Sequence, residues 1–92
     1  MYRIVPSRQF KKGLKKIVRS GHFDLSLLNQ IINALARGEV LDKKFKDHTL
    51  IGRMKGLREC HVKPDLLLVY SIRENELMLQ LFRVGSHSDL FD

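Results

Sequence analysis

The sequence has no tryptophan, a single cysteine and only two prolines among its 92 residues. One cysteine, Cys60, excludes an intramolecular disulfide and a zinc site made of several thiolates. No apolar run approaches the roughly 18 residues that a membrane-spanning helix needs, and the opening MYRIVPSRQF lacks the apolar stretch of a secretory signal. We therefore expect a cytoplasmic protein with no membrane partner.

Acidic residues are absent from the first 20 positions, which hold seven arginines and lysines. Over the whole chain, 17 basic residues stand against 10 acidic ones, for a net charge of +7. This balance favours a polyanionic partner, either nucleic acid or a strongly acidic protein. The cations that fall on the polar side of the first predicted helix form the predicted contact surface: Lys11, Lys12, Lys15, Lys16 and Arg19.

The first half of the chain predicts one short strand and two helices. The strand covers residues 2–5. Ser7 is a favourable N-cap for a helix that continues to about residue 20 and stops at Gly21. Asp24 can cap a second helix, whose apolar residues share one face and which Gly38 terminates. The two helices therefore form a hairpin.

Three strands are predicted in the second half, at 57–62, 66–72 and 76–84, after a polar, loop-like segment at 39–55. The middle strand is a continuous apolar run, typical of a buried central strand. This order of elements indicates an α+β fold, in which an N-terminal strand and a helical hairpin pack on a twisted antiparallel sheet. At 92 residues and 43% hydrophobic content, we expect one domain spanning residues 1–92, with residues 85–92 as a tail.

Histidines provide the candidate chemistry, at positions 22, 48, 61 and 87. Together with nearby Asp, Arg and Lys, they supply what cleavage of RNA without a metal needs: a base for the 2′-hydroxyl, an acid for the leaving 5′-oxygen, and cations for the phosphate. Structural roles are the alternative, with His22 as a solvated turn residue and His61 as a hydrogen-bonded strand histidine. The histidine spacing matches no strong metal-binding pattern. Cys60 is expected to be a small buried apolar residue.

The segment DHTLIGRMKGLRECHVKPDLLLVY, together with LFRVGSHSDLF, resembles the YafQ branch of the RelE superfamily of bacterial type II toxins. The likeness extends over the whole chain in length and element order, and its specific motifs lie between Lys46 and Phe91. The resemblance implies a ribosome-dependent mRNA endoribonuclease that inhibits translation, with its active surface on the concave side of the sheet. The cleavage reaction that the resemblance implies needs no metal and no cofactor.

Site residues follow from the positions that match the family's motifs. His87 is implied as the general acid, and Asp65 or His61 as the base or as the residue that orients it. The implied catalytic set is His48, His61, Asp65 and His87. His48 and Arg83 would stabilise phosphate charge. Phe91 would stack on a nucleobase of the RNA or hold it in place.

The resemblance also implies partners. These are the ribosome at its A site, the mRNA substrate and an acidic antitoxin, with operator DNA reached only through the antitoxin. The basic face of the first helix would then contact ribosomal RNA, separate from the histidine-rich half of the chain. Relatives can carry tryptophans where this chain has Met54 and Leu66, so codon preference is expected to differ. The alternative function is a non-catalytic basic RNA- or DNA-binding module, or a co-repressor.

Overall fold

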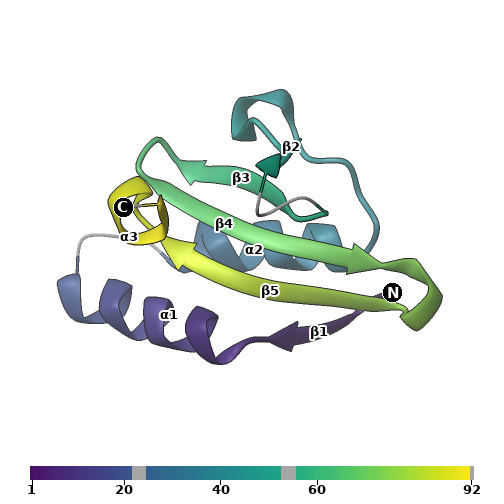
Figure 1. The fold of residues 1–92 in the computed structure, drawn as a ribbon, viewed down its shortest axis with the longest axis horizontal. Helices are drawn as coiled ribbons and strands as arrows, with labels where there is room; N and C mark the ends of the chain where they lie inside the picture. Colours follow the sequence, from purple (N-terminus) through teal and green to yellow (C-terminus); the bar gives the residue numbers. More distant parts are fainter. Residues whose placement is uncertain (22–24, 53–55, 92) are drawn as a thin grey trace.

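The computed structural model describes residues 1–21, 25–52 and 56–91, and its helices and strands follow the predicted order (Figure 1). The predictions placed on His22, Asp24 and Met54 lie outside the described residues. The elements are β1 (Arg3–Pro6), α1 (Arg8–Ser20), α2 (Leu25–Ala36), η1 (Lys43–Phe45), β2 (His48–Thr49), β3 (Arg58–Lys63), β4 (Leu66–Arg73), η3 (Glu74–Glu76), β5 (Met78–Gly85) and α3 (His87–Phe91).

The strands form one five-stranded sheet in the order β1-β5-β4-β3-β2. Strands β3, β4 and β5 pair antiparallel, as predicted, and β2 adds to β3 antiparallel. Strand β1 instead pairs parallel with β5, with Arg3 opposite Met78. The fold class is confirmed as α+β, and the sheet is mixed instead of purely antiparallel. The difference has a simple cause: no hairpin connects β1 to its partner, so the residue pattern of β1 does not encode its direction.

Helix α1 begins and ends where the sequence predicts. The Ser7 side chain accepts a hydrogen bond from the backbone nitrogen of Phe10 at 3.0 Å, which satisfies one unpaired donor of the first turn. Gly21 adopts φ 67°, in the left-handed region, and closes the helix C-terminus. Both termini therefore follow from single residues that local physics favours at these positions.

Helix α1 also lies unusually close to β5. A Cβ atom built on Gly13 would sit 2.2 Å from the carbonyl oxygen of Val84, a distance that real Cβ atoms do not reach. On either side of this contact, Phe10 and Ile17 are buried. Glycine at position 13 therefore allows the helix backbone to rest directly on the strand.

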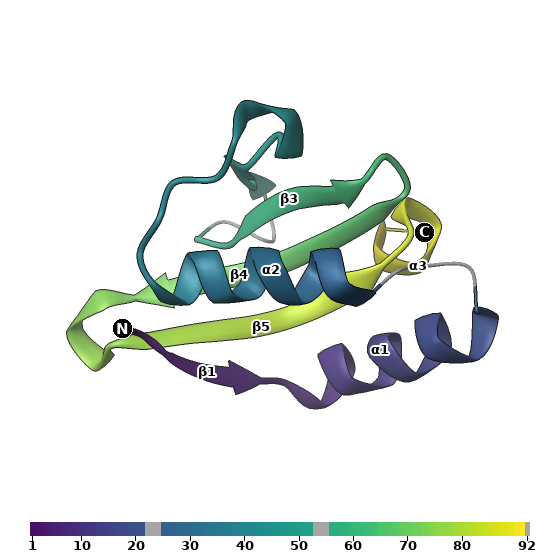
Figure 2. The same ribbon diagram turned by 180° about the vertical axis from the view of Figure 1, so that it is seen from behind.

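The two faces of the sheet carry different layers. Helices α1 and α2 cover one face, and α3 lies on the other (Figures 1 and 2). Alternate residues of β4, such as Leu66 and Leu68, join the main core beneath the helices. Leu67 and Val69 point the other way and pack with Leu90 of α3 in a second, smaller cluster. Strand β4 is therefore buried on both sides, as its continuous apolar run predicts.

Two segments contain more regular structure than expected. The loop-like stretch 39–55 includes η1 and the two-residue strand β2, and the predicted tail includes α3. Helix α3 is held by a reciprocal cap: Ser86 Oγ accepts from the backbone nitrogen of Asp89, and Asp89 Oδ2 accepts from that of Ser86, both at 3.1 Å. A helix of five residues is too short to produce a visible periodicity. Among the described helices, none has the length and apolar character needed to cross a membrane.

Candidate active site

The face of the sheet away from α1 and α2, which we call the open face, carries the histidines of β2 and β3. Cys60 and Val62 of β3 are buried in the main core, so the alternation of a strand directs Glu59 and His61 to the open face. Strand β2 lies beside β3, with His48 directly opposite Glu59. The backbone pairing therefore brings three titratable side chains together from two segments of the chain.

The carboxylate of Glu59 lies between the two histidines. Its Oε1 atom is 3.4 Å from Nε2 of His48 and 3.8 Å from Nε2 of His61. The two imidazole rings are 6.3 Å apart, centroid to centroid. The Glu59 side chain is only 8% exposed, against 48% for His48 and 29% for His61. The two histidines are therefore accessible from solvent, and the buried carboxylate lies beneath them.

Glu59 is the site residue that the sequence interpretation missed. Its Oε2 atom is buried without a hydrogen-bond partner, so this group carries a desolvation cost that ordinary surface glutamates avoid. The available signal was its position two residues before His61, because residues i and i+2 of a strand share a face.

The orientation of the His48 ring follows from a backbone contact. Its Nδ1 atom lies 2.6 Å from the carbonyl oxygen of Lys46. A carbonyl oxygen only accepts hydrogen bonds, so Nδ1 carries the hydrogen and donates it. The other ring nitrogen, Nε2, is the atom that faces Glu59, and it can donate to that carboxylate only when the ring carries both hydrogens.

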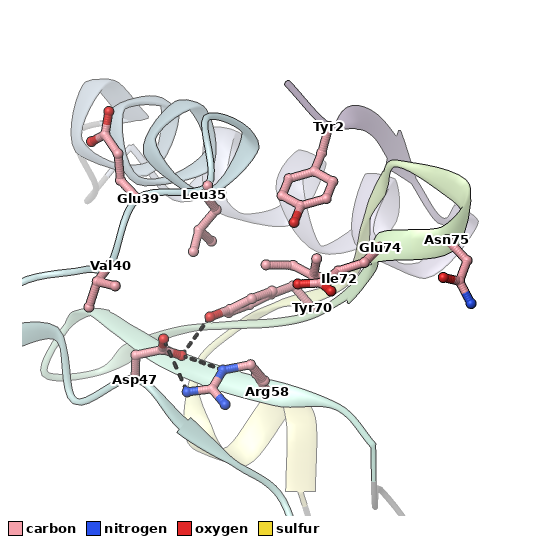
Figure 3. A pocket seen from close by; sticks show the side chains of 11 residues that line it. Tyr2, Leu35, Glu39, Val40, Asp47, Arg58, Tyr70, Ile72, Glu74 and Asn75 are labelled. Atoms are coloured by element: carbon pink, nitrogen blue, oxygen red, sulfur yellow. Dashed lines mark hydrogen bonds and ion pairs between the residues drawn. The ribbon is translucent and has the colours of Figure 1, made fainter.

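A polar network anchors the segment that carries His48 (Figure 3). Asp47 Oδ1 accepts a hydrogen bond of 2.6 Å from the Tyr70 hydroxyl and one of 3.3 Å from Nε of Arg58. Burial is the main cause that raises the pKa of the Tyr70 hydroxyl, and the hydrogen bond to Asp47 is the second. The hydroxyl therefore stays a neutral donor. Asp47 thereby ties the two-residue strand β2 to the core of the sheet.

The same network borders a cavity of about 630 Å³ between the end of the sheet and α2 (Figure 3). Its lining includes the carboxylates of Glu39, Asp47 and Glu74. Arg58 also lines the cavity but is already paired with Asp47, so the acidic groups outnumber the basic one and disfavour a phosphate ligand. This cavity is therefore not the candidate site for RNA chemistry.

A second group of predicted residues gathers around α3. The rings of His87 and Phe91, one helical turn apart, have centroids separated by 5.1 Å. The Asp65 side chain contacts the backbone of this helix, with its Oδ1 atom 3.5 Å from the backbone nitrogen of His87. Asp65 is therefore placed to position α3, and it does not meet the imidazole of His87 through a hydrogen bond.

The two groups share the open face without touching. Leu67 is registered with His61 on one side and with Gly85 on the other, and Gly85 ends the strand that leads into α3. In the part of the chain that the structure describes, no hydrogen bond or ring contact joins His87 to His48 or His61. A ligand that lies across Leu67 would meet histidines at both ends.

Comparison with known proteins assigns the chain to a family. Residues 2–92 match the family described as bacterial toxin of type II toxin-antitoxin system, YafQ. The chain belongs to the YafQ toxin family. It is 34% identical over 86 residues to the mRNA interferase toxin YafQ of Escherichia coli strain K12, covering 92% of this chain and 90% of that relative.

Solved structures of related toxins share the fold. A metal-bound toxin from Helicobacter pylori superposes with a TM-score of 0.91 at 50% identity, covering 99% of this chain and 100% of that one. The DinJ-YafQ complex of Escherichia coli matches with a TM-score of 0.86 at 32% identity and full coverage of both chains. The α+β fold predicted from the order of elements is therefore confirmed.

Among the described residues of this YafQ-family chain, no group of three or more histidine, cysteine, aspartate and glutamate side chains is arranged to hold a metal ion. Cys60 is fully buried in the core, and burial raises the pKa of its thiol to about 12. A thiol in this environment stays protonated at neutral pH and is a poor nucleophile. The expectation that Cys60 is a buried apolar residue is confirmed.

The basic helix is not separate from the candidate site, contrary to our expectation. Lys16 Nζ lies 2.6 Å from Asp89 Oδ1, so α1 is linked to the helix that carries His87. The hydrogen bond from Lys16 is the main cause of the lowered pKa of Asp89. Arg83 Nη2 donates to the backbone oxygen of Asp89 at 3.2 Å, and the predicted phosphate contact therefore adjoins the same helix. Sequence patterns do not reveal this, because the ion pair joins residues far apart in the chain.

Lys12 and Lys16 also line a pocket of about 390 Å³ together with Arg83, between α1, β5 and α3. Both lysines, like the other three cations of the predicted contact surface, are exposed. One edge of α1 therefore extends the positive charge of the site, whereas Lys11 and Lys15 do not line this pocket.

Proposed function

We propose that this protein is a ribosome-dependent mRNA endoribonuclease, the toxin of a type II toxin-antitoxin pair, acting in the cytoplasm as the single domain expected over residues 1–92. The observation that carries the proposal is the pair of histidine groups on the open face, one around Glu59 and one on α3, with cations beside the second. The name of the Escherichia coli relative, an mRNA interferase, supports the same activity.

The proposed reaction needs two proton transfers and no metal. The 2′-hydroxyl of the mRNA loses its proton to a base and attacks the adjacent phosphorus. The bond to the 5′-oxygen breaks, and that oxygen takes a proton from an acid. The products are a 2′,3′-cyclic phosphate and a 5′-hydroxyl. General acid and base groups on opposite sides of the phosphate are therefore required.

Residue roles follow from the two groups. His87 is the acid, because it is exposed on α3 and its ring is held beside Phe91. The geometry favours His61 over Asp65 as the base, since His61 is backed by the Glu59 carboxylate while Asp65 contacts the backbone of α3. His48 and Arg83 stabilise phosphate charge, and Phe91, 39% exposed, stacks on a base.

The partners follow from the charge distribution and the relatives. We infer that the ribosome presents the mRNA codon in its A site and that the exposed face of α1 binds ribosomal RNA through Lys11, Lys12, Lys15, Lys16 and Arg19. A relative is solved in complex with DinJ, which supports an antitoxin partner for this chain. An acidic antitoxin segment would be attracted to the same basic surface, and operator DNA would be reached through it.

Replacing His87 tests the proposal. The His87→Ala variant should still sediment with ribosomes but cleave ribosome-bound mRNA at least about 100-fold more slowly, the usual scale for the loss of a proton-transfer group. Ser88→Ala, one residue further along the same short helix, is the matched control and should cleave at the wild-type rate. Undiminished cleavage by His87→Ala would remove it from the mechanism. RNA binding by the wild type with no cleavage would favour the non-catalytic binding module.

A further inference from the structure

A groove continues from the histidine group toward α2. It lies between η1, the last residues of β3 and the first half of α2, and its volume is about 420 Å³. His61 and Lys46 are among its lining residues. These residues already belong to the site, because His61 faces Glu59 and the Lys46 carbonyl holds His48. The groove therefore adjoins the site.

The floor of the groove is apolar. Leu27, Phe45, Val62 and Pro64 supply its carbon surface. Leu27 and Phe45 are only partly buried against the main core, so part of each side chain is available to a ligand. An aromatic ring beside aliphatic carbon is the surface on which an unpaired nucleobase stacks.

The rim of the groove is positive. Lys44, Lys46 and Lys63 line it, and none of its lining residues is a carboxylate. The Lys44 ammonium lies 5.2 Å from the centroid of the Phe45 ring, so cation and aromatic surface adjoin each other. The cavity beside Tyr70 differs, because its lining includes three acidic residues and only one basic residue, Arg58. The composition of the groove favours a ligand with a planar apolar part joined to an anion.

From these observations we propose that the groove is a nucleotide subsite. It binds an unpaired nucleotide of the RNA substrate next to the cleaved position, with the base on Phe45 and the phosphate among the three lysines. The inference rests on the proposed function, since it extends the site that His61 begins. It assigns to η1 the selection of a flanking nucleotide, a role separate from the proton transfers at His61 and His87.

Binding of a non-cleavable RNA tests the subsite without relying on catalysis. A 2′-O-methyl RNA hexanucleotide has no free 2′-hydroxyl nucleophile, and its titration into the labelled full-length protein can be followed by NMR. We expect shifts at Phe45 and Val62 as well as at His61. Phe45→Leu should weaken binding about tenfold through lost stacking. Thermal unfolding of Phe45→Leu checks that the variant is folded.

The neighbouring lysines of η1 provide a matched control. Lys44→Ala should reduce the salt-dependence slope of oligonucleotide binding by about 0.7, the value for one phosphate contact on a single strand. Lys43→Ala, with the same charge change at an exposed position outside the groove, should leave the slope unchanged. In ribosome assays, Lys44→Ala should raise KM while kcat stays within about twofold.

The outcomes separate this inference from the proposed function. If the oligonucleotide shifts the groove residues but the wild type cleaves no mRNA, the proposed function fails, and the groove is still shown to bind RNA. If the wild type cleaves mRNA while Phe45 and Val62 do not respond and Lys44→Ala behaves like Lys43→Ala, the subsite is refuted. Shifts at the groove with the antitoxin alone, and none with RNA, would also overturn it in favour of an antitoxin surface.

Discussion

Replacing Gly13 with alanine tests how the basic helix is seated on the sheet. The added Cβ would lie 2.2 Å from the Val84 carbonyl oxygen, and real contacts begin near 3.0 Å, so α1 must retreat by about 0.8 Å. Strain of this kind in a packed interface costs about 3 kcal/mol. Alanine recovers about 1 kcal/mol of helix propensity. We therefore expect a net loss of about 2 kcal/mol in the free energy of unfolding.

Urea denaturation followed by circular dichroism measures this difference. With a slope of about 1.3 kcal/mol per molar urea, the midpoint of Gly13→Ala should fall by about 1.5 M. Lys15→Gly, at an exposed position of the same helix, is the control and should cost only about 0.7 kcal/mol. If Gly13→Ala instead raised stability by about 1 kcal/mol, as at an ordinary helix position, the close contact between α1 and β5 would be refuted. The retreat should also lower cleavage, since Lys16 moves away from Asp89.

Three further predictions concern charge and reactivity. Replacing Lys11 and Lys15 with alanine should flatten the salt dependence of ribosome co-sedimentation. Lys16→Ala should instead lower cleavage even at saturating ribosomes, because it releases α3. Identical behaviour of the two variants would contradict these separate roles of the lysines. Because the pKa of Asp89 is lowered in the folded protein, the Asp89 carboxylate stabilises the fold fully above the ordinary carboxyl pKa near 4, and this stabilisation is lost as the pH falls toward the lowered value. In urea unfolding between about pH 5 and 2, Asp89→Asn should therefore lose less stability than the wild type. An equal loss would argue against the Lys16 contact. The Cys60 thiol, whose pKa burial raises to about 12, should resist iodoacetamide at pH 8 until the protein unfolds, and rapid labelling of the native state would be inconsistent with its burial.

Local signals in the sequence predicted most of the fold. Ser7 and Gly21 delimit α1 because a side-chain oxygen and a left-handed residue are what helix ends need. The apolar run of β4 predicted its burial on both faces. The direction of β1 and the existence of α3 were not predicted. Both depend on contacts between distant segments: β1 finds β5, and Leu90 of α3 packs on Leu67.

In the candidate site, too, local signals predicted some residues, and others depend on contacts between distant segments. The histidines were predictable because few side chains exchange protons near neutral pH. Glu59 was not, because it resembles any strand glutamate until the pairing of β2 with β3 places it between His48 and His61. The link from Lys16 to Asp89 escaped for a related reason, since an ion pair between helices has no signature in either segment.

The parallel pairing of β1 with β5 has a consequence for synthesis. Arg3 is translated well before its partner Met78, which belongs to β5, and α1 likewise rests on β5 through Gly13 and Val84. The edge strand and the basic helix therefore have no surface to fold on until β5 has been made and released. A chain that ends before β5 lacks both the strand on which β1 and α1 pack and His87. Under the proposed function, the molecule becomes harmful to its producer only once translation of the whole sheet is complete.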